Sequence, residues 1–225
     1  MEEIGNSVFG LRLKIDLIMS CSGGVARPLP YPVQINSIKM ENYKMTQKTF
    51  FNSVTNGNKD ILQEIIDLLN QNNIEYCVIG GLAVNAYVEP VVSLDLDIVV
   101  VIEGIDKIIE STKDKFKIEN FPHSINLGSK DSDVRIQIQT DKRYQAFIKK
   151  ALFKDILGYQ MKVASLEDVL TGKVWAYSDI ERRGSKRQKD LADIMRIIES
   201  FPELKSILPK SIIENINKIV VTTQL

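Results

Sequence analysis

The chain has 225 residues, enough for one large domain or two small ones with a sizeable hydrophobic core. The 29 Lys and Arg residues balance the 29 Asp and Glu residues, so any attraction to nucleic acid must come from a local cluster of charge. Two cysteines without a CxxC pair argue against a disulfide or zinc framework, and no apolar run reaches the roughly 18 residues of a membrane span. We therefore expect a cytoplasmic protein without a membrane partner.

Residues 1–44 show no sustained helical or strand period. Pro28, Pro30 and Pro32 follow Gly23 and Gly24 closely, and prolines at this spacing break a helix or a central strand. We expect this segment to be a disordered tail or extraneous N-terminal sequence. The rest of the chain divides by pattern into an α/β core over residues 45–163 and a helical region over residues 164–225.

The first regular elements follow Asp60. A helix is predicted there because apolar residues recur at helical spacing, at Ile61, Leu62, Ile65, Ile66, Leu68 and Leu69. "IEYCVI" (74–79) predicts a strand that ends at Gly80 and Gly81, and "LAVNAY" (82–87) predicts a short helix that stops near Pro90. "LDLDIVVVI" (94–102) predicts a second strand, and its apolar second half indicates burial on both faces.

The middle of the chain alternates between helix and strand patterns. "GIDKIIESTKDKF" (104–116) predicts an amphipathic helix, and "FKIENF" (116–121) and "HSINLG" (123–128) predict short strands. "DVRIQIQTD" (133–141) alternates strictly, which is typical of a strand with one apolar and one polar face. "YQAFIKKAL" (144–152) predicts a helix, and "YQMKVA" (159–164) predicts the last strand.

After residue 164 the pattern is helical only. A helix capped by Ser165, with the acidic Asp168 three residues later, is predicted through about residue 177, and a second helix from Ser185 through residue 198. Two shorter helices are expected around Pro202 and Pro209. The whole pattern predicts an α+β fold in which a sheet with flanking helices is followed by a helical C-terminal half.

Asp95 and Asp97 are the first candidate site residues. Residues two apart on a strand share a face, so the two carboxylates must project together and repel each other. A divalent cation would remove that repulsion, and Mg²⁺ suits carboxylate and phosphate oxygens. The alternative is an exposed strand face with two solvated aspartates.

Gly80 and Gly81 are the second candidate feature. Glycines between a strand and a helix let the backbone approach a ligand such as a phosphate closely. The alternative is a tight strand-to-helix turn, which needs glycine in any case.

The two features together resemble the signature of the DNA polymerase β-like nucleotidyltransferase superfamily: a glycine pair, about a dozen residues, and DxD. Here residues 82–94 separate Gly81 from Asp95. The resemblance implies a minimal polymerase β-like mixed sheet, with Gly80 and Gly81 at the phosphates and Asp95 and Asp97 holding Mg²⁺. It also implies a third carboxylate on a neighbouring strand.

That third carboxylate is where the sequence departs from the family. The residue at the expected place within the strand is Gln137, which is uncharged and a poorer Mg²⁺ ligand. Asp133 lies on the same face of the predicted strand, and we predict that it supplies the third catalytic and metal-binding acid. The alternative for Asp133 is a turn residue in "SKDSD".

The segment from residue 166 to 194 resembles the helical part of AbiEii/AbiGii toxin-like nucleotidyltransferases. The matching residues are Lys173, Ala176, Arg183, Lys189, Asp190 and Asp193. The resemblance implies nucleotide binding by Lys173, Arg183 and Lys189, and the local cluster of cations adds Lys186 as a nucleotide-binding candidate. It also suggests as partners a nucleoside triphosphate, an RNA or tRNA acceptor, and a cognate antitoxin protein, since members of this family include toxins of toxin–antitoxin pairs.

The residues themselves leave alternatives open in this segment. Five cations crowd into eight residues, and they could hold a triphosphate or an RNA backbone, or form a solvated helix start: Arg182, Arg183, Lys186, Arg187 and Lys189. Lys173 lies beside an apolar stripe and could simply reach solvent. Asp190, which shares a helix face with Asp193, could take a proton from the acceptor hydroxyl or pair with Lys186 or Lys189.

The interpretation that joins these features is Mg²⁺-dependent transfer of a nucleotidyl group from a nucleoside triphosphate to an acceptor hydroxyl. The predicted catalytic residues are Asp95, Asp97, Asp133 and Asp190. The alternatives are a non-catalytic nucleotide- or partner-binding module with the same fold, which Gln137 favours, and a regulatory partner in a toxin–antitoxin pair.

Overall fold

The computed structural model describes residues 45–223. The predicted N-terminal tail over residues 1–44 lies outside them. No helix within the described range is long and apolar enough to cross a membrane.

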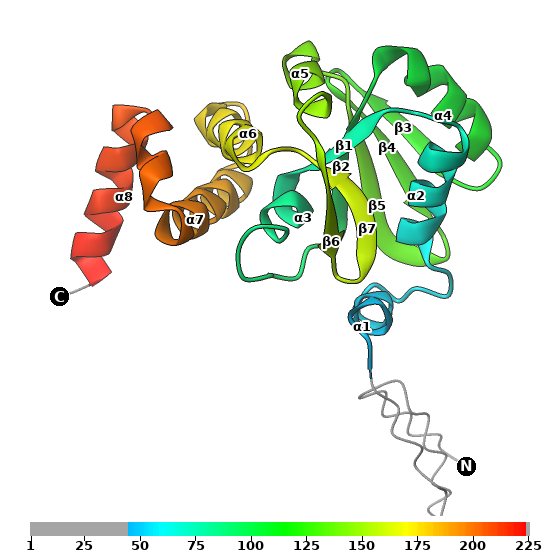
Figure 1. Ribbon diagram of the computed structural model, residues 1–225, viewed down its shortest axis with the longest axis horizontal. Coiled ribbons are helices and arrows are strands. Elements are labelled where there is room, and N and C mark those ends of the chain that lie inside the picture. Colours follow the sequence, from blue (N-terminus) through cyan, green and yellow to red (C-terminus); the bar gives the residue numbers. More distant parts are fainter. Residues whose placement is uncertain (1–44, 224–225) are drawn as a thin grey trace, which may run out of the picture.

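A seven-stranded mixed sheet is the centre of the N-terminal half (Figure 1). Its strand order is β3-β4-β5-β2-β1-β7-β6. The two pairs β2–β5 and β1–β7 are parallel, and the other neighbours are antiparallel. The strands are β1 Tyr76–Ile79, β2 Asp95–Val100, β3 Lys117–Phe121, β4 Ser124–Ser129, β5 Ser132–Gln139, β6 Leu152–Ile156 and β7 Tyr159–Val163.

Helices cover both faces of this sheet, with α2 and α4 on one side and α6 on the other (Figure 1). The apolar stripe of α2 is buried, and Asp60 caps its start by accepting a hydrogen bond from the backbone N–H of Gln63 at 3.1 Å. The helices of this half are α1 Gln47–Val54, α2 Ile61–Gln71, α3 Gly80–Val84, α4 Ile105–Thr112 and α5 Gln145–Ile148, with 3₁₀ turns η1 Ile102–Gly104 and η2 Lys142–Tyr144.

The C-terminal half is helical, as predicted. It consists of α6 Leu166–Ser178, α7 Gly184–Ser200, the 3₁₀ helix η3 Pro202–Ile207 and α8 Lys210–Thr223. The predicted cap is confirmed, because Ser165 Oγ accepts from the backbone N–H of Asp168 at 3.2 Å. In Figure 1, α6 lies next to the sheet and α8 lies farthest from it.

One predicted element needs correction, and two observed elements were not predicted. The helix expected over residues 144–152 is only the short α5, and residues 152–156 form the edge strand β6, which pairs antiparallel with β7. The turn between β6 and β7 uses positive φ at Leu157 (56°) and Gly158 (83°), the geometry of a two-residue hairpin. The helix α1 was also not predicted.

The remaining elements agree with the sequence patterns, and the α+β fold class is confirmed. Leu96, Ile98, Val99 and Val100 of β2 are almost fully buried, as the apolar run predicted. The side chains of Ile79, Asp97 and Gln137 stand beside one another across three adjacent strands, because Asp97 is in register with both neighbours. This row leads to the candidate site.

Candidate active site

Asp97 lies directly against Gly80. Gly80 follows Ile79, the register partner of Asp97, and takes a positive φ of 71°. A Cβ atom on Gly80 would stand 2.1 Å from Asp97 Oδ2, so any other residue would collide with the carboxylate. The structure thus brings the predicted glycine pair and the second aspartate of DxD together.

Asp95 lies on the same face two residues earlier, as its position in the strand predicted. Its register partner on β5 is Arg135, and Arg135 Nη2 stands 2.7 Å from Asp95 Oδ1. The Arg135 side chain is 67% exposed, so this ion pair is open to solvent. Salt bridges of this kind are weak and easily exchanged for another cation.

The structure does not bring Asp133 to Asp97, and the prediction that it supplies the third acid is not supported. The parallel register places Gln137 beside Asp97 and Arg135 beside Asp95. Asp133 lies two residues before Arg135, toward the start of β5, and so lies farther from Asp97. Asp133 is exposed and accepts a hydrogen bond from Asn56 Nδ2 at 2.6 Å. Within residues 45–223, no group of three or more His, Cys, Asp or Glu residues is arranged to hold a metal ion.

A cavity of about 80 Å³ lies between the sheet and α6. Asp97, Gly80, Lys173 and Asp190, all predicted as site residues, contribute to its wall. The other lining residues are Ile79, Gln137, Gln139, Tyr144, Asp168, Val169, Gly172, Ala176 and Arg182. Burial raises the pKa of Tyr144 to about 12, so its phenol stays protonated at neutral pH and can donate a hydrogen bond.

Lys173 is only 6% exposed and is held between two buried aspartates. Its Nζ lies 3.0 Å from Asp190 Oδ1 and 2.7 Å from Asp193 Oδ2. Burial alone would lower the pKa of Lys173, but the charges and hydrogen bonds of Asp193 and Asp190 outweigh it and raise the pKa above its usual range. Lys173 is therefore charged, and it does not reach solvent as a snorkelling lysine would.

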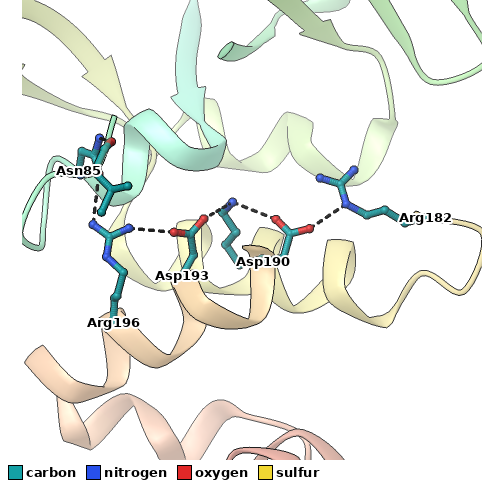
Figure 2. Close-up of polar contacts among 7 residues, drawn as sticks. Asn85, Arg182, Asp190, Asp193 and Arg196 are labelled. Carbon is teal, nitrogen blue, oxygen red and sulfur yellow. Dashed lines mark hydrogen bonds and ion pairs between the residues drawn. The ribbon is translucent and has the colours of Figure 1, made fainter. Parts of the chain in front are cut away.

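Each aspartate also has an arginine partner, which makes a chain of alternating charge from Arg182 to Arg196 (Figure 2). Arg182 Nε donates to Asp190 Oδ2 at 2.7 Å, and Arg196 Nη1 donates to Asp193 Oδ1 at 2.8 Å. Arg196 continues across to the first half of the chain, where Asn85 Oδ1 accepts from Nη2 at 3.3 Å. The partners of Asp190 are thus Lys173 and Arg182, and not Lys186 or Lys189, the pairing that the sequence had left as an alternative.

The predicted cation cluster divides between two environments. The charges of Lys186 and Arg182 act on Asp97, and Lys189 Nζ stands 3.8 Å from where a Cβ of Gly81 would lie. Arg183, by contrast, is exposed outside the cavity and contacts Ser185. Arg182 lines the cavity, whereas Arg183, the residue immediately before α7, does not.

Burial raises the pKa of Asp97 above its usual range. The positive charge of Lys173 opposes this shift, and the negative charge of Asp95 adds to it. An additional cation beside Asp97 would stabilise its ionised carboxylate. Mg²⁺ commonly takes one or two protein carboxylates together with substrate phosphates, so Asp95 and Asp97 fit such an ion without a third acid.

Sequence reasoning did not predict Arg182, Asp168 or Tyr144 as cavity residues. Asp168, Gly172 and Ala176 are spaced four residues apart and share one face of α6, and all three line the cavity. The sequence signal for this cavity-lining face was an acidic residue followed, at intervals of four, by two small residues. The sequence analysis had interpreted Asp168 only as part of the helix cap.

No family model matches the chain, and no curated protein matches it in sequence. Solved structures do. The antibiotic-resistance factor ANT(2'')-Ia is 12% identical with a TM-score of 0.50, covering 73% of this chain and 95% of that chain. The lincosamide antibiotic adenylyltransferase LnuA is 16% identical with a TM-score of 0.46, covering 63% and 98%. An antigenic nucleotidyltransferase-like protein from Paracoccidioides brasiliensis is 18% identical with a TM-score of 0.44, covering 66% and 75%. The match to ANT(2'')-Ia shows that the mixed sheet and the helices that follow it form a nucleotidyltransferase-like fold.

Proposed function

We propose that this protein transfers a nucleotidyl group from a nucleoside triphosphate to an acceptor hydroxyl, with Mg²⁺ as cofactor. The observation that carries the proposal is the position of Asp97 against Gly80, in a cavity whose opposite wall presents Lys173 and Arg182. A carboxylate, a close backbone and cations around one cavity are what binding of a metal-bound triphosphate requires.

Each end of the triphosphate has candidate partners. Asp95 and Asp97 would hold Mg²⁺ together with phosphate oxygens, and the bound ion would neutralise charge that develops during transfer. Gly80 and Gly81 leave room for phosphate beside the backbone, and Lys189 lies next to Gly81. Lys186 is exposed near Asp97 and is free to reach toward a phosphate.

Asp190 is the proposed proton acceptor. In the transfer step, the acceptor oxygen bonds to the α-phosphorus, the bond to pyrophosphate breaks, and the hydroxyl proton moves to a base. Both oxygens of Asp190 are engaged, by Lys173 and by Arg182. Arg182 has the more exposed side chain of these two cations (35% against 8%), so it can leave Asp190 for a phosphate and free Oδ2.

The cavity is too small for a whole nucleotide. Small-molecule pockets commonly measure about 300–1,000 Å³, against about 80 Å³ here. We infer that the enclosed part takes only a fragment of the nucleotide, or that α6 and α7 move away from the sheet when it binds.

The finer part of the proposal concerns the acceptor and the biological role. The residues shared with AbiEii/AbiGii toxin-like proteins support an RNA or tRNA acceptor, a toxin role and a cognate antitoxin partner, in the cytoplasm. The exposed cations Arg183, Lys186 and Lys189 suit an anionic acceptor. Of the matching residues, Arg183 stands outside the cavity, which fits acceptor contact better than nucleotide binding.

A non-catalytic binding module is the second candidate. Gln137 favours it, because an amide stands beside Asp97 where the superfamily resemblance implies a carboxylate. Such a module would bind nucleotide or a partner without turnover.

Incubation with each labelled nucleoside triphosphate and total tRNA, with and without Mg²⁺, tests the proposal. We expect Mg²⁺-dependent label on the RNA, lost in Asp97→Asn and kept in Asp133→Asn. Nucleotide binding without transfer to any acceptor would favour the module. A protein that binds no nucleotide by calorimetry would overturn both.

A further inference from the structure

Asp168 is a cavity residue that the proposed transfer step does not use. It lies in the first turn of α6, where the backbone N–H of Asp168 is already taken by Ser165. Its side chain lies on the cavity-lining face of the helix, together with Gly172 and Ala176. At Gly172 this face is in contact with Tyr144, because a Cβ there would stand 3.3 Å from the Tyr144 ring.

The Asp168 carboxylate is only half satisfied. Asp168 is 7% exposed, and its Oδ1 lies 3.2 Å from Lys150 Nζ. Its Oδ2 is buried, and no hydrogen-bond donor of the described residues reaches it. A buried acceptor without a donor is unfavourable, so a ligand that offers one is bound more tightly.

Asp168 and Asp97 mark different parts of the same cavity. The charges that act most strongly on Asp97 are those of Lys173, Asp95, Lys186 and Arg182, whereas the charge of Asp168 acts on Cys77 and Tyr87. Asp97 lines the cavity from β2 and Asp168 lines it from α6, and the charge of Asp168 is not among those that shift the pKa of Asp97. Phosphate belongs beside the cations near Asp97, and an anionic carboxylate would repel it.

We propose that Asp168 is a specificity-determining residue whose Oδ2 accepts a hydrogen bond from the nucleoside part of the bound nucleotide. This inference rests on the proposed function. An ionised carboxylate only accepts hydrogen bonds, so its partner must be an N–H or O–H group. Two parts of a nucleoside offer one: an amino group of cytosine, adenine or guanine, and a ribose hydroxyl.

The same chemistry predicts which nucleotides are disfavoured. Uracil and hypoxanthine present a carbonyl where cytosine and adenine present an amino group, and a carbonyl facing Oδ2 would set two acceptors against each other. A deoxyribose lacks the hydroxyl. A site built around one donor discriminates against an analogue that lacks it.

Matched nucleotide pairs test the proposal by binding alone. Affinities are measured by calorimetry in Mg²⁺ for CTP against UTP and ATP against ITP, and for ATP against its 2′-deoxy and 3′-deoxy forms. We expect the donor-bearing member of the base pairs, or of the ribose pairs, to bind about ten-fold more tightly or better.

Asp168→Asn gives a sharper test. Lys150 would hold the amide oxygen of the asparagine, which turns its NH₂ toward the position of Oδ2 and replaces an acceptor with a donor. We expect the preference to narrow to about two-fold or to reverse. Glu167→Gln, which changes an exposed acid in the same helical turn, should keep the wild-type preference.

Each possible result either supports or overturns the proposed role of Asp168. Nucleotides that bind equally well within every pair, or an Asp168→Asn protein that keeps the preference, would overturn the role of Asp168 and leave the proposed function intact. Wild-type protein that binds no nucleotide would overturn both. If Asp168→Asn fails to fold, the pairs measured on the wild-type protein still decide.

Discussion

Two pairs of aspartates each contribute one residue to the cavity wall, Asp97 and Asp190, and the two pairs lie in opposite electrostatic surroundings. Asp95 and Asp97 share a face of strand β2, and Asp190 and Asp193 share a face of helix α7. The helical pair is 2% and 4% exposed, and each member has two cationic partners. The strand pair is only partly buried, with Arg135 on Asp95 and no ion pair on Asp97 among the described residues.

This difference indicates that the helical pair helps to hold the helices together, whereas the strand pair can bind a cation from outside the protein. Around α7, three cations within the protein more than offset the charge of two acids, and the network joins α6, α7 and the loop after α3 (Figure 2). On β2 the negative charge is not offset in this way, and both burial and the charge of Asp95 disfavour the ionised form of Asp97. The strand pair therefore has capacity for an external cation, whereas the helical pair has little.

The largest expected effect comes from breaking the helical network at Lys173. Lys173→Met should lower the free energy of unfolding by about 3–5 kcal/mol, because it leaves two buried acids without their shared partner. Urea denaturation measures this loss. Lys186→Met, an exposed cation on the neighbouring helix, is the matched control and should change stability by less than about 0.5 kcal/mol. Equal losses in the two variants would contradict the contrast between buried and open charge.

Asp97→Asn breaks the strand pair and should act in the opposite direction on stability. Burial raises the pKa of Asp97 above the 3.8 of a free aspartate, so the folded protein binds this proton more tightly than the unfolded chain does. The ionised carboxylate therefore destabilises the metal-free fold at neutral pH, and this cost disappears as the pH falls below 3.8.

We accordingly expect Asp97→Asn, in EDTA, to melt at the same temperature as wild type or higher at pH 7, with the gain vanishing in acid. Transferase activity should fall by about 100-fold or more. Thermal melts at several pH values measure the effect on stability, and the labelling assay measures the effect on transferase activity. A variant that is less stable than wild type at pH 7 would show that Asp97 has a structural role instead.

The smallest expected effect is that of Asp133→Asn. Its partner Asn56 is on the surface, so stability should stay within about 0.5 kcal/mol of wild type and Mg²⁺ affinity should not change. Gln137→Glu is the informative counterpart, because it would place a third carboxylate beside Asp97 and should raise Mg²⁺ affinity. Calorimetric titration with Mg²⁺ compares the two. Weaker Mg²⁺ binding in Asp133→Asn would restore Asp133 as a ligand.

The features that the sequence determined are local ones. Alternation along a strand is enough to place Asp95 and Asp97 on one face, and the positions of Ser165 and Asp168 are enough to begin α6. The glycine pair after a predicted strand marked the turn between that strand and the next helix. All of these depend on neighbours within a few residues, so no knowledge of the fold was needed.

Tertiary structure decided the rest, because it depends on register and packing between distant segments. The choice between Asp133 and Gln137 follows from how β5 aligns with β2, and alternation within β5 is the same for either residue. Strand β6 escaped prediction because, as an edge strand, it leaves Leu152 and Phe153 exposed and shows no clear buried face. The partners of Lys173 are fixed only when α6 packs on α7, which buries the lysine where its cost must be offset by two acids from the other helix.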